Sequence, residues 1–600
     1  MVESNNPDIN FDSLDPYECI EIIKTNLDSN YIVSNGLKKI IELSGGLKFD
    51  GNPYEPTRAA ISKNGGCNLI MKIFKKYSSD PSVLKLACNA LRNLSRNVEN
   101  ASNFNILGGC EEIIKIIKKF SAKNTELCCE CCTAIANLAM NPSICAKLGS
   151  LKICEVICLV LKTQIKSKDL VKFSCMAISN LATLEFNSKS FGKSDCCGLV
   201  LESLRIHAEE QDVIEQGLIA VGNLSKYDEN CKKIGLLCGC EIVLECIKSN
   251  PKHFAVLLNG CEALSRLATN EDNISIIWLS GGCEVIIEAM KEYIEHPELV
   301  IYGCETLSNL IYNDNNCGKL GSIGGGDIVY SILKMHIKNA EVCISSCSTI
   351  AFLTSNEQNI ANYISHETFE LLANAIDVHL LNTEIVEACC TSIARYLKFS
   401  SEENSKSDMR CDSIRESIVS ALKQHKTHMG IVLQGLVAIT YLAVKEGNVV
   451  KLGMIGCCEV VIEILVSHLA SKDIAIYGCY AVGQLMTHDL NRVKLNLIGG
   501  SEVIIGAMRS HINSPEVALS GCNVIALFAN DHSIKTSLIS IFTEFLTELM
   551  IIHPSNDDIE VAVRHALKIT NNAAINNLIL IDNEIADKAN KYQKNVYFEV

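Results

Sequence analysis

The feature that most constrains the fold is a segment that recurs about every 43 residues along the 600-residue chain. One copy reads NGCEALSRLATNEDNISIIWLSGGCEVIIEAM, from Asn259 to Met290. Eleven copies align on one position, here called position zero, and successive copies lie 43 residues apart except for intervals of 44 and 46. The position-zero residues are Asn93, Asn137, Asn180, Asn223, Arg266, Asn309, Phe352, Arg395, Tyr441, Gln484 and Leu527. Since one unit of this length cannot bury its own apolar face, the period predicts a stack of like units.

Each copy predicts three helices. Positions −2 and +1, such as Leu264 and Leu267, are apolar in nearly every copy, and their spacing places them on one helical face. A short helical stretch follows, then a glycine pair such as Gly281 and Gly282, then a second apolar-periodic stretch. Weaker copies near Glu42 and Lys568 flank the eleven. The chain is therefore expected to hold about 12 to 13 three-helix units.

A small residue stands at position −6 of every copy. It is Ala, Cys, Ser or Gly, as in Ala87, Ser174 and Gly260. Glycine inside a helix costs about 0.5 to 1 kcal/mol relative to alanine. Its recurrence at one register predicts that another helix approaches closely there.

These units resemble the armadillo repeat. The resemblance rests on the ALxNLA pattern, the asparagine-rich turn, the short first helix, the glycine pair and the apolar second helix. It implies an all-α fold, a right-handed α-solenoid with armadillo-type repeats over residues 33–575. Residues 1–32 are expected to form an acidic N-terminal segment and residues 576–600 a C-terminal tail.

The chain contains 31 cysteines, and their spacing indicates packing. Position −5 is cysteine in nine copies and leucine at Leu218 and Leu436. A position where Leu replaces Cys is a packing position, because free Cys behaves as a small hydrophobe. The cluster CCECC, Cys128 to Cys132, leaves a thiolate metal site as the rival interpretation.

Composition narrows the function. The net charge of −15 leaves the chain without the overall positive charge that nucleic-acid binding usually needs. The most apolar long segment, TSLISIFTEFLTELMIIHP, contains two glutamates, which disfavour a membrane-spanning helix. GSIGGGD, Gly321 to Asp327, stands where the repeat period places a glycine pair, and it lacks the rest of a phosphate-loop motif. No set of catalytic, metal-ligating or cofactor-binding residues stands out. We expect a non-enzymatic protein without nucleic-acid binding or membrane insertion.

The third helices supply the predicted binding groove. Solenoids leave an extended concave surface, which the third helices line in armadillo arrays. Asparagine offers two donors and an acceptor, and the resemblance implies that a column of such residues pairs with the backbone of an extended peptide. The alternative is that each Asn ties its own helix to a neighbouring repeat. The predicted groove residues are Asn93, Asn137, Asn180, Asn223, Arg266, Asn309, Glu262 and Glu305. The two glutamates suggest a basic partner segment.

Two further predictions concern the same repeats. The change at position zero after Asn309, from Phe352 onward, predicts either a more apolar ligand or a plain extension of the scaffold. Turn asparagines at position +4 are expected to end helices in the left-handed conformation. They are Asn97, Asn141, Asn270, Asn313 and Asn356.

The family resemblance does not identify a subfamily. Importin-α-like repeats place Trp four residues before the Asn, where this chain has residues such as Asn89, Thr133 and Met176, and a β-catenin-like lysine-rich groove is not matched either. We expect a cytoplasmic scaffold that holds extended segments of partner proteins, with a nuclear location and the oligomeric state left open. The alternatives are a nucleocytoplasmic transport or small-GTPase-regulatory adaptor, and a thiol- or metal-sensing protein.

Overall fold

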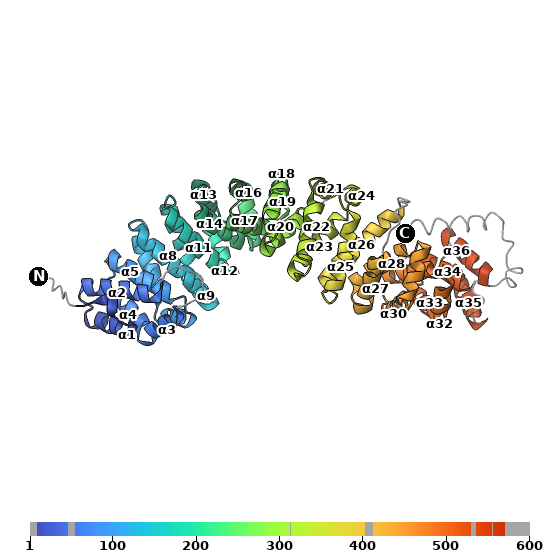
Figure 1. Ribbon diagram of the computed structural model, residues 1–600, viewed down its shortest axis with the longest axis horizontal. Coiled ribbons are helices and arrows are strands. Elements are labelled where there is room, and N and C mark those ends of the chain that lie inside the picture. The colour runs from blue at the N-terminus through green and yellow to red at the C-terminus, as the bar shows by residue number, and fades with distance from the viewer. Residues whose placement is uncertain are drawn as a thin grey trace. The chain divides into compact units, whose positions relative to one another are not determined.

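A computed structural model describes residues 9–45, 54–311, 314–402, 412–529, 536–554 and 556–570. These residues form 36 α-helices and one 3-10 helix, Phe11–Ser13, and contain no β-strand (Figure 1). The all-α prediction is confirmed. The chain divides into two compact units, residues 1–310 and 311–600, which are taken in turn.

The first unit begins with a helix pair and continues with six triplets. Each triplet has a short first helix, a second helix and a third helix that carries position zero. The pair is α1 (Pro16–Thr25) and α2 (Asn30–Ser44). The triplets are α3 (Glu55–Lys63), α4 (Gly66–Lys76), α5 (Pro81–Leu94); α6 (Val98–Ile106), α7 (Gly109–Phe120), α8 (Thr125–Ala139); α9 (Pro142–Ser150), α10 (Ile153–Thr163), α11 (Lys168–Leu181); α12 (Glu185–Lys193), α13 (Cys196–Ile206), α14 (Gln211–Ser225); α15 (Asp228–Leu236), α16 (Gly239–Ser249), α17 (Phe254–Leu267); and α18 (Glu271–Leu279), α19 (Gly282–Glu292), α20 (Pro297–Leu310).

The second unit holds four triplets and two helix pairs. The triplets are α21 (Asp314–Ser322), α22 (Gly325–Met335), α23 (Ala340–Leu353); α24 (Glu357–Asn362), α25 (His366–Val378), α26 (Thr383–Glu402); α29 (Glu446–Met454), α30 (Cys457–Ser467), α31 (Lys472–Leu485); and α32 (Asp489–Leu497), α33 (Gly500–Ser510), α34 (Pro515–Ala529). The pairs are α27 (Asp412–Gln424) with α28 (Met429–Leu442), and α35 (Thr536–Ile552) with α36 (Asp557–Thr570). The predicted three-helix repeat is therefore confirmed.

Like helices stack on like helices within each unit. The third helices α2, α5, α8, α11, α14, α17 and α20 each contact the next, and so do α23, α26, α28, α31, α34 and α36 (Figure 1). The apolar positions −2 and +1, such as Leu264 and Leu267, are fully buried in this stack. Burial of the apolar side chain at each such position stabilises the array by about 1.5 to 3 kcal/mol relative to an exposed side chain.

The glycine pairs form the elbow between the first and second helices. The first glycine adopts a left-handed conformation, with φ of 84° at Gly108, 74° at Gly281 and 88° at Gly324. A Cβ on the second glycine would lie 2.7 Å from the carbonyl oxygen of Ile277 at Gly282. Glycine is therefore favoured at both positions of the elbow, at the first by backbone conformation and at the second by close packing. GSIGGGD is one of these elbows, as its spacing predicts.

The small residue at position −6 faces the second helix of its own repeat. A Cβ on Gly260 would lie 2.6 Å from Ile247 Cγ1, and one on Gly478 would lie 2.4 Å from Leu465 Cδ2. The predicted close approach is confirmed. The approaching group is a side chain of the preceding second helix.

The prediction for the turn asparagines was wrong. Asn97, Asn141, Asn270 and Asn356 begin the next short helix as N-caps, with extended backbone conformations such as φ −81° and ψ 128° at Asn97. Asn97 accepts a hydrogen bond at Oδ1 from the backbone N–H of Asn100 at 2.8 Å. An N-cap amide satisfies one of the free N–H groups at the start of a helix, which a left-handed C-terminal residue would not do. Asn313 lies outside the described residues.

The cysteines at position −5 pack inside the array. All nine, and the two leucines that replace them, are completely buried. Of the 30 cysteines in the described ranges, only Cys238 is exposed. Burial raises the pKa of Cys175 and of Cys261 to about 12, so these thiols are protonated at neutral pH.

A second asparagine column, at position +7, is buried in the short first helices. It comprises Asn100, Asn187, Asn230, Asn273, Asn316, Asn359, Asn448 and Asn491. Asn273 Nδ2 donates to the carbonyl of Leu267 at 3.1 Å and to that of Cys231, one repeat earlier, at 3.2 Å. Asn359 forms the same two bonds with Leu353 and Cys317. At Asn100, Asn187, Asn273 and Asn359 the amide thus closes the turn before its short helix and joins consecutive repeats.

A glycine of the preceding short helix makes room for five of these amides, those of Asn187, Asn230, Asn273, Asn359 and Asn491. A Cβ on Gly235 would lie 1.7 Å from Asn273 Oδ1, and one on Gly453 would lie 1.7 Å from Asn491 Oδ1. The asparagine and the glycine are 38 residues apart in sequence and form one contact. Neither can change alone without disturbing the joint between repeats.

The ends of the array are described only in part. Helix α1 lies within residues 1–32, and its buried Ile23 packs so closely on α2 that a Cβ on Gly36 would come within 2.4 Å of it. The predicted C-terminal tail, residues 576–600, lies outside the described residues.

Candidate functional site: the third-helix face

The position-zero asparagines join consecutive third helices. Asn137 Nδ2 donates to the Arg92 carbonyl at 2.8 Å, Asn180 Nδ2 to the Ala136 carbonyl at 2.9 Å, and Asn223 Nδ2 to the Ser179 carbonyl at 3.2 Å. Asn93 and Asn309 form the same bond, to Ile41 and Ser265 respectively, at 3.3 and 3.5 Å. Each acceptor immediately precedes position zero of the previous copy. The tie between repeats, one of the two roles predicted for this column, is therefore present.

This tie uses only part of each amide. Asn137, Asn180 and Asn223 are half-buried, and in the described residues no donor reaches their Oδ1 atoms. Each keeps an acceptor and a second N–H. Asn93 differs, because it is buried and its Oδ1 accepts from Arg92 Nε at 3.4 Å. Asn309 is the most exposed member of the column.

The charged residues of the predicted groove gather on α17 and α20. Arg266 and Glu262 lie on α17 and Glu305 lies on α20. Burial raises the pKa of Glu305, the nearby Arg266 opposes that rise, and Glu262 adds to it. All three side chains are half-buried, and Arg266 Nε has no hydrogen-bond partner among the described residues. The structure thus brings together one guanidinium and two carboxylates on this face.

A tight ion pair lies further towards the N-terminus on the same face. Arg92 Nη1 is 2.8 Å from Glu130 Oε2, and both side chains are largely buried. Asn89 joins the pair by donating to Glu130 Oε1 at 3.1 Å and accepting from Arg92 Nη2 at 2.9 Å. The cluster is internally satisfied, and burial raises the pKa of Glu130.

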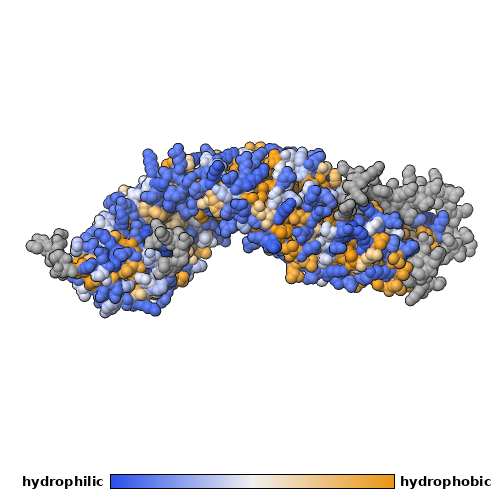
Figure 2. All heavy atoms as spheres, viewed as in Figure 1, coloured by the Kyte–Doolittle hydropathy of each residue, from blue (hydrophilic) through white to orange (hydrophobic). Residues whose placement is uncertain are grey.

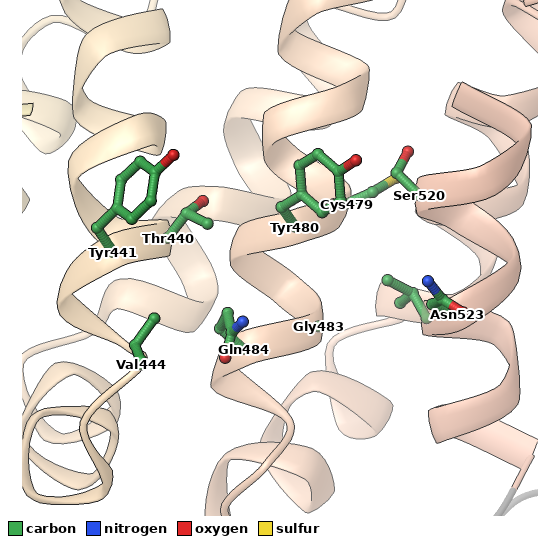
Figure 3. Close-up of a pocket in the computed structure, with 10 residues that line it drawn as sticks. Thr440, Tyr441, Val444, Cys479, Tyr480, Gly483, Gln484, Ser520 and Asn523 are labelled. Carbon is green, nitrogen blue, oxygen red and sulfur yellow. The ribbon is translucent and has the colours of Figure 1, made fainter. Parts of the chain in front are cut away.

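The second unit presents a shallow groove on its third helices. It runs over α28, α31 and α34 and is lined by Tyr441, Val444, Tyr480, Gln484 and Asn523, among others. Figure 3 shows the side chains of Tyr441 and Tyr480 on neighbouring helices, with Gln484 below Tyr480 and Asn523 across the groove on the next helix. The labelled lining residues carry no formal charge, in contrast to the first unit.

Surface hydropathy also varies along the chain. Hydrophilic residues dominate much of the visible face of the first unit, whereas hydrophobic residues gather in several patches over the second (Figure 2). At position zero itself, Phe352 is 48% exposed, while Tyr441 is 9% exposed. The two units therefore offer different chemistry on the same kind of helix.

Thiol and metal chemistry can be assessed for the described residues. In these ranges no group of three or more His, Cys, Asp or Glu side chains is placed to hold a metal ion. In the cluster CCECC, Cys131 Sγ lies 3.6 Å from Cys88 Sγ, and burial raises the pKa of Cys128 and of Cys129 to about 12. Cys131 and Cys132 contact the two neighbouring third helices, and Cys128 Sγ donates to the Phe120 carbonyl of its own repeat, which agrees with packing.

In the described ranges, no single helix is long and apolar enough to cross a bilayer. Helices α18 and α19 meet the length and composition criteria only as a pair, and the pair is bent by 75° at its glycine elbow.

Two features of the third-helix face and its supports escaped prediction from sequence. The first is the uncharged groove, which is lined by Tyr480 and Asn523 at position −4. The sequence reveals these two residues only when position −4 is compared between the two halves of the chain. The second is the column of buried asparagines at position +7. These asparagines recur with the same period as the glycine pairs, so the column could have been found from the sequence.

Comparison with known proteins places this fold in a family. The family model described as "LRRK2 ARM repeat" matches residues 192–552. No curated protein matches the sequence. Among solved structures, one reported for the phosphorylation-controlled interaction between cadherin and β-catenin is 16% identical, covers 86% of this chain and 99% of its own, and has a TM-score of 0.62.

An engineered protein is similar to the same degree in sequence. It is 16% identical, covers 72% of this chain and 99% of its own, and has a TM-score of 0.58. At such identities these structures support the fold alone. The family model covers more than half of the chain, and the chain therefore belongs to the LRRK2 armadillo-repeat family.

Proposed function

We propose that this protein is a non-enzymatic cytoplasmic scaffold whose third-helix faces bind extended segments of partner proteins. The observation that carries the proposal is the free acceptor on each of Asn137, Asn180 and Asn223. These amides are held in place by their bonds to the preceding repeat. A fixed acceptor costs less conformational entropy on binding than a mobile one.

The two units favour different segments. In the first unit, the two carboxylates of Glu262 and Glu305 exceed the single positive charge of Arg266, and this net negative charge favours a segment with basic side chains. In the second unit, the uncharged groove with Tyr441 and Tyr480 favours an apolar or aromatic segment.

Alanine at the three asparagines is an ambiguous test, because it also breaks the ties between third helices. A sharper test obstructs the face and leaves those ties in place. Met176 and Ile219 stand four residues before Asn180 and Asn223 on α11 and α14, and both are half-buried. Their replacement by arginine, M176R/I219R, adds bulk and charge beside the amides.

Leu159 and Ile206 provide a matched control. They are 50% and 44% exposed and lie on the second helices α10 and α13, so L159R/I206R makes the same chemical change on another face. Peptides selected from a random library on the full chain would be titrated by fluorescence anisotropy. We expect M176R/I219R to weaken binding of peptides selected on the first unit at least about 10-fold, which corresponds to 1.4 kcal/mol. Equal loss in both variants, or none in M176R/I219R, would refute the groove.

The alternative role as a small-GTPase-regulatory or transport adaptor would differ in its partner, which would be a folded GTPase. It is tested by nucleotide exchange on a panel of small GTPases with the full chain. Acceleration of exchange that M176R/I219R abolishes would favour that role over passive scaffolding.

A further inference from the structure

We propose that the outer surface formed by the second helices α4, α7 and α10 binds the anionic headgroups of a phospholipid membrane, without insertion of any helix. The starting observation is a local reversal of charge. The whole chain has 54 Lys and Arg against 69 Asp and Glu, whereas residues 63–172 have 17 against 8. The overall acidity of the protein hides this basic segment.

The basic side chains gather on one part of the first unit. The lysine patch is defined as Lys72, Lys75, Lys118, Lys123, Lys162 and Lys166. All six are exposed, and within the described residues none has a carboxylate within ion-pair distance. Three neighbours are already engaged: Lys76 pairs with Asp28, Lys115 lies 2.7 Å from Glu112, and Lys119 donates to the Ser78 carbonyl at 2.9 Å. Helix α10 carries one carboxylate of its own, Glu155, which is exposed.

Contacts between repeats hold the patch together. Helix α7 packs beside α10, and Gln164, at the end of α10, hydrogen-bonds to the Ser121 carbonyl at the end of α7. The bond from Lys119 to Ser78 brings the end of α7 against the turn after α4. The lysine-bearing ends of the three helices therefore form one continuous surface.

Helix stability explains only part of this clustering. A lysine in the last turn is favourable near the negative end of the helix dipole, and α16, α19 and α22 each have one. Helices α4 and α7 have two each, and Lys72 adds a further charge one turn earlier on α4. Lys76, Lys115 and Lys119 are engaged, but among the described residues Lys72, Lys75 and Lys118 keep unpaired charges. These charges repel one another, so their excess is better explained by an anionic partner.

The side chains favour a lipid surface over nucleic acid. The patch consists of lysines, which act as mobile point charges, and it lacks the arginine forks suited to bidentate recognition. Phe74 and Phe120 are buried, and the Tyr77 hydroxyl donates to the Leu27 carbonyl, so no aromatic face is offered for stacking of bases. Leu159, half-exposed on the same helix as Lys162, could lie at the headgroup boundary.

The test is flotation of the full chain with vesicles of phosphatidylcholine containing 30 mol% phosphatidylserine, about 0.15 M salt being present. The patch variant K72Q/K75Q/K118Q/K162Q should bind at least about 100-fold more weakly, since each surface lysine contributes on the order of 1 kcal/mol of attraction. The control K226Q/K252Q/K291Q/K338Q removes the same charge from four exposed lysines elsewhere. It should retain binding, and pure phosphatidylcholine vesicles should bind neither protein.

Three outcomes would overturn the inference: no flotation of the wild-type chain with anionic vesicles, equal loss in both quadruple variants, or tighter binding to a single-stranded oligonucleotide or an acidic peptide than to the vesicles. The inference is independent of the groove. M176R/I219R should bind vesicles normally, and the patch variant should bind groove peptides normally.

Discussion

A single amide can connect three helices in this array. Asn273 lies on α18. Its Nδ2 donates to the Leu267 carbonyl on α17, which closes the turn between these helices, and to the Cys231 carbonyl on α15, the short helix of the preceding repeat. Its Oδ1 occupies the space left by Gly235. Asn187 and Asn359 repeat this arrangement, with Gly149 and Gly321 in the place of Gly235. At this scale the repeats are joined by a few fully buried polar groups, and apolar contact alone does not set their register.

Replacement of Asn273 by alanine should strongly destabilise the first unit. It removes one buried hydrogen bond from each of two carbonyl groups, at about 1 to 1.5 kcal/mol per bond, or roughly 2 to 3 kcal/mol in all. Asn223→Ala, in the half-buried position-zero column, is the comparison and should cost about 1 kcal/mol. Urea unfolding followed by circular dichroism measures both. Similar values for the two variants would contradict the distinction between the buried and half-buried columns.

At the scale of the helix, the elbow between first and second helices carries a conformational demand. Most elbows meet it with glycine, but Lys152, Asp195 and Cys238 adopt positive φ values of 60°, 60° and 59°. A side chain in this region costs about 1 to 2 kcal/mol. These three elbows therefore store strain that the glycine elbows avoid.

Cys238→Gly should stabilise the protein by about 1 kcal/mol, because glycine removes the steric cost while adding some unfolded-state entropy. Cys238 is exposed, so the change sacrifices no packing. The reverse change, Gly281→Ala, should destabilise the chain by a similar amount, since Gly281 has φ of 74°. Thermal unfolding under reducing conditions measures both effects. A lower melting temperature for Cys238→Gly would contradict the strain argument.

At the scale of the whole molecule, many buried thiols add up to one property. Burial raises the pKa of Cys154, Cys175, Cys261 and Cys479 to about 12, from an ordinary value of about 9. In the unfolded chain these thiols ionise near pH 9, while in the folded chain they stay protonated. The folded state therefore binds more protons above pH 9, and its stability is complete below that pH and falls as pH rises through the folded pKa values.

Unfolding free energy should thus decline steeply between pH 9 and 11 in reducing buffer. Each thiol contributes a slope of about 1.4 kcal/mol per pH unit. Cys261→Ala should lower the absolute stability at pH 8 but reduce the slope by one thiol's share. The measurement is urea unfolding at half-unit pH steps. An unchanged slope in the variant would show that Cys261 does not titrate between the two states.

The sequence by itself determined the repeat, its three helices, the glycine elbow and the role of the cysteines, because each follows from local periodicity. A buried position such as Cys261 differs from an exposed one by its place within the repeat, which can be read from the sequence. The assignment of Asn97 and its equivalents failed, since a residue between two helices can end one or begin the next, and only backbone conformation decides which.

Only the tertiary structure decided which groups meet. Sequence predicted the column of Asn137, Asn180 and Asn223 but left its partners open. Their hydrogen bonds to the preceding repeat, the contact between Gly235 and Asn273, and the joining of lysines from α4, α7 and α10 all depend on how one repeat rests on the last. A period specifies which residues are equivalent, whereas contacts across the stack depend on the rotation and spacing between repeats, which no single repeat encodes.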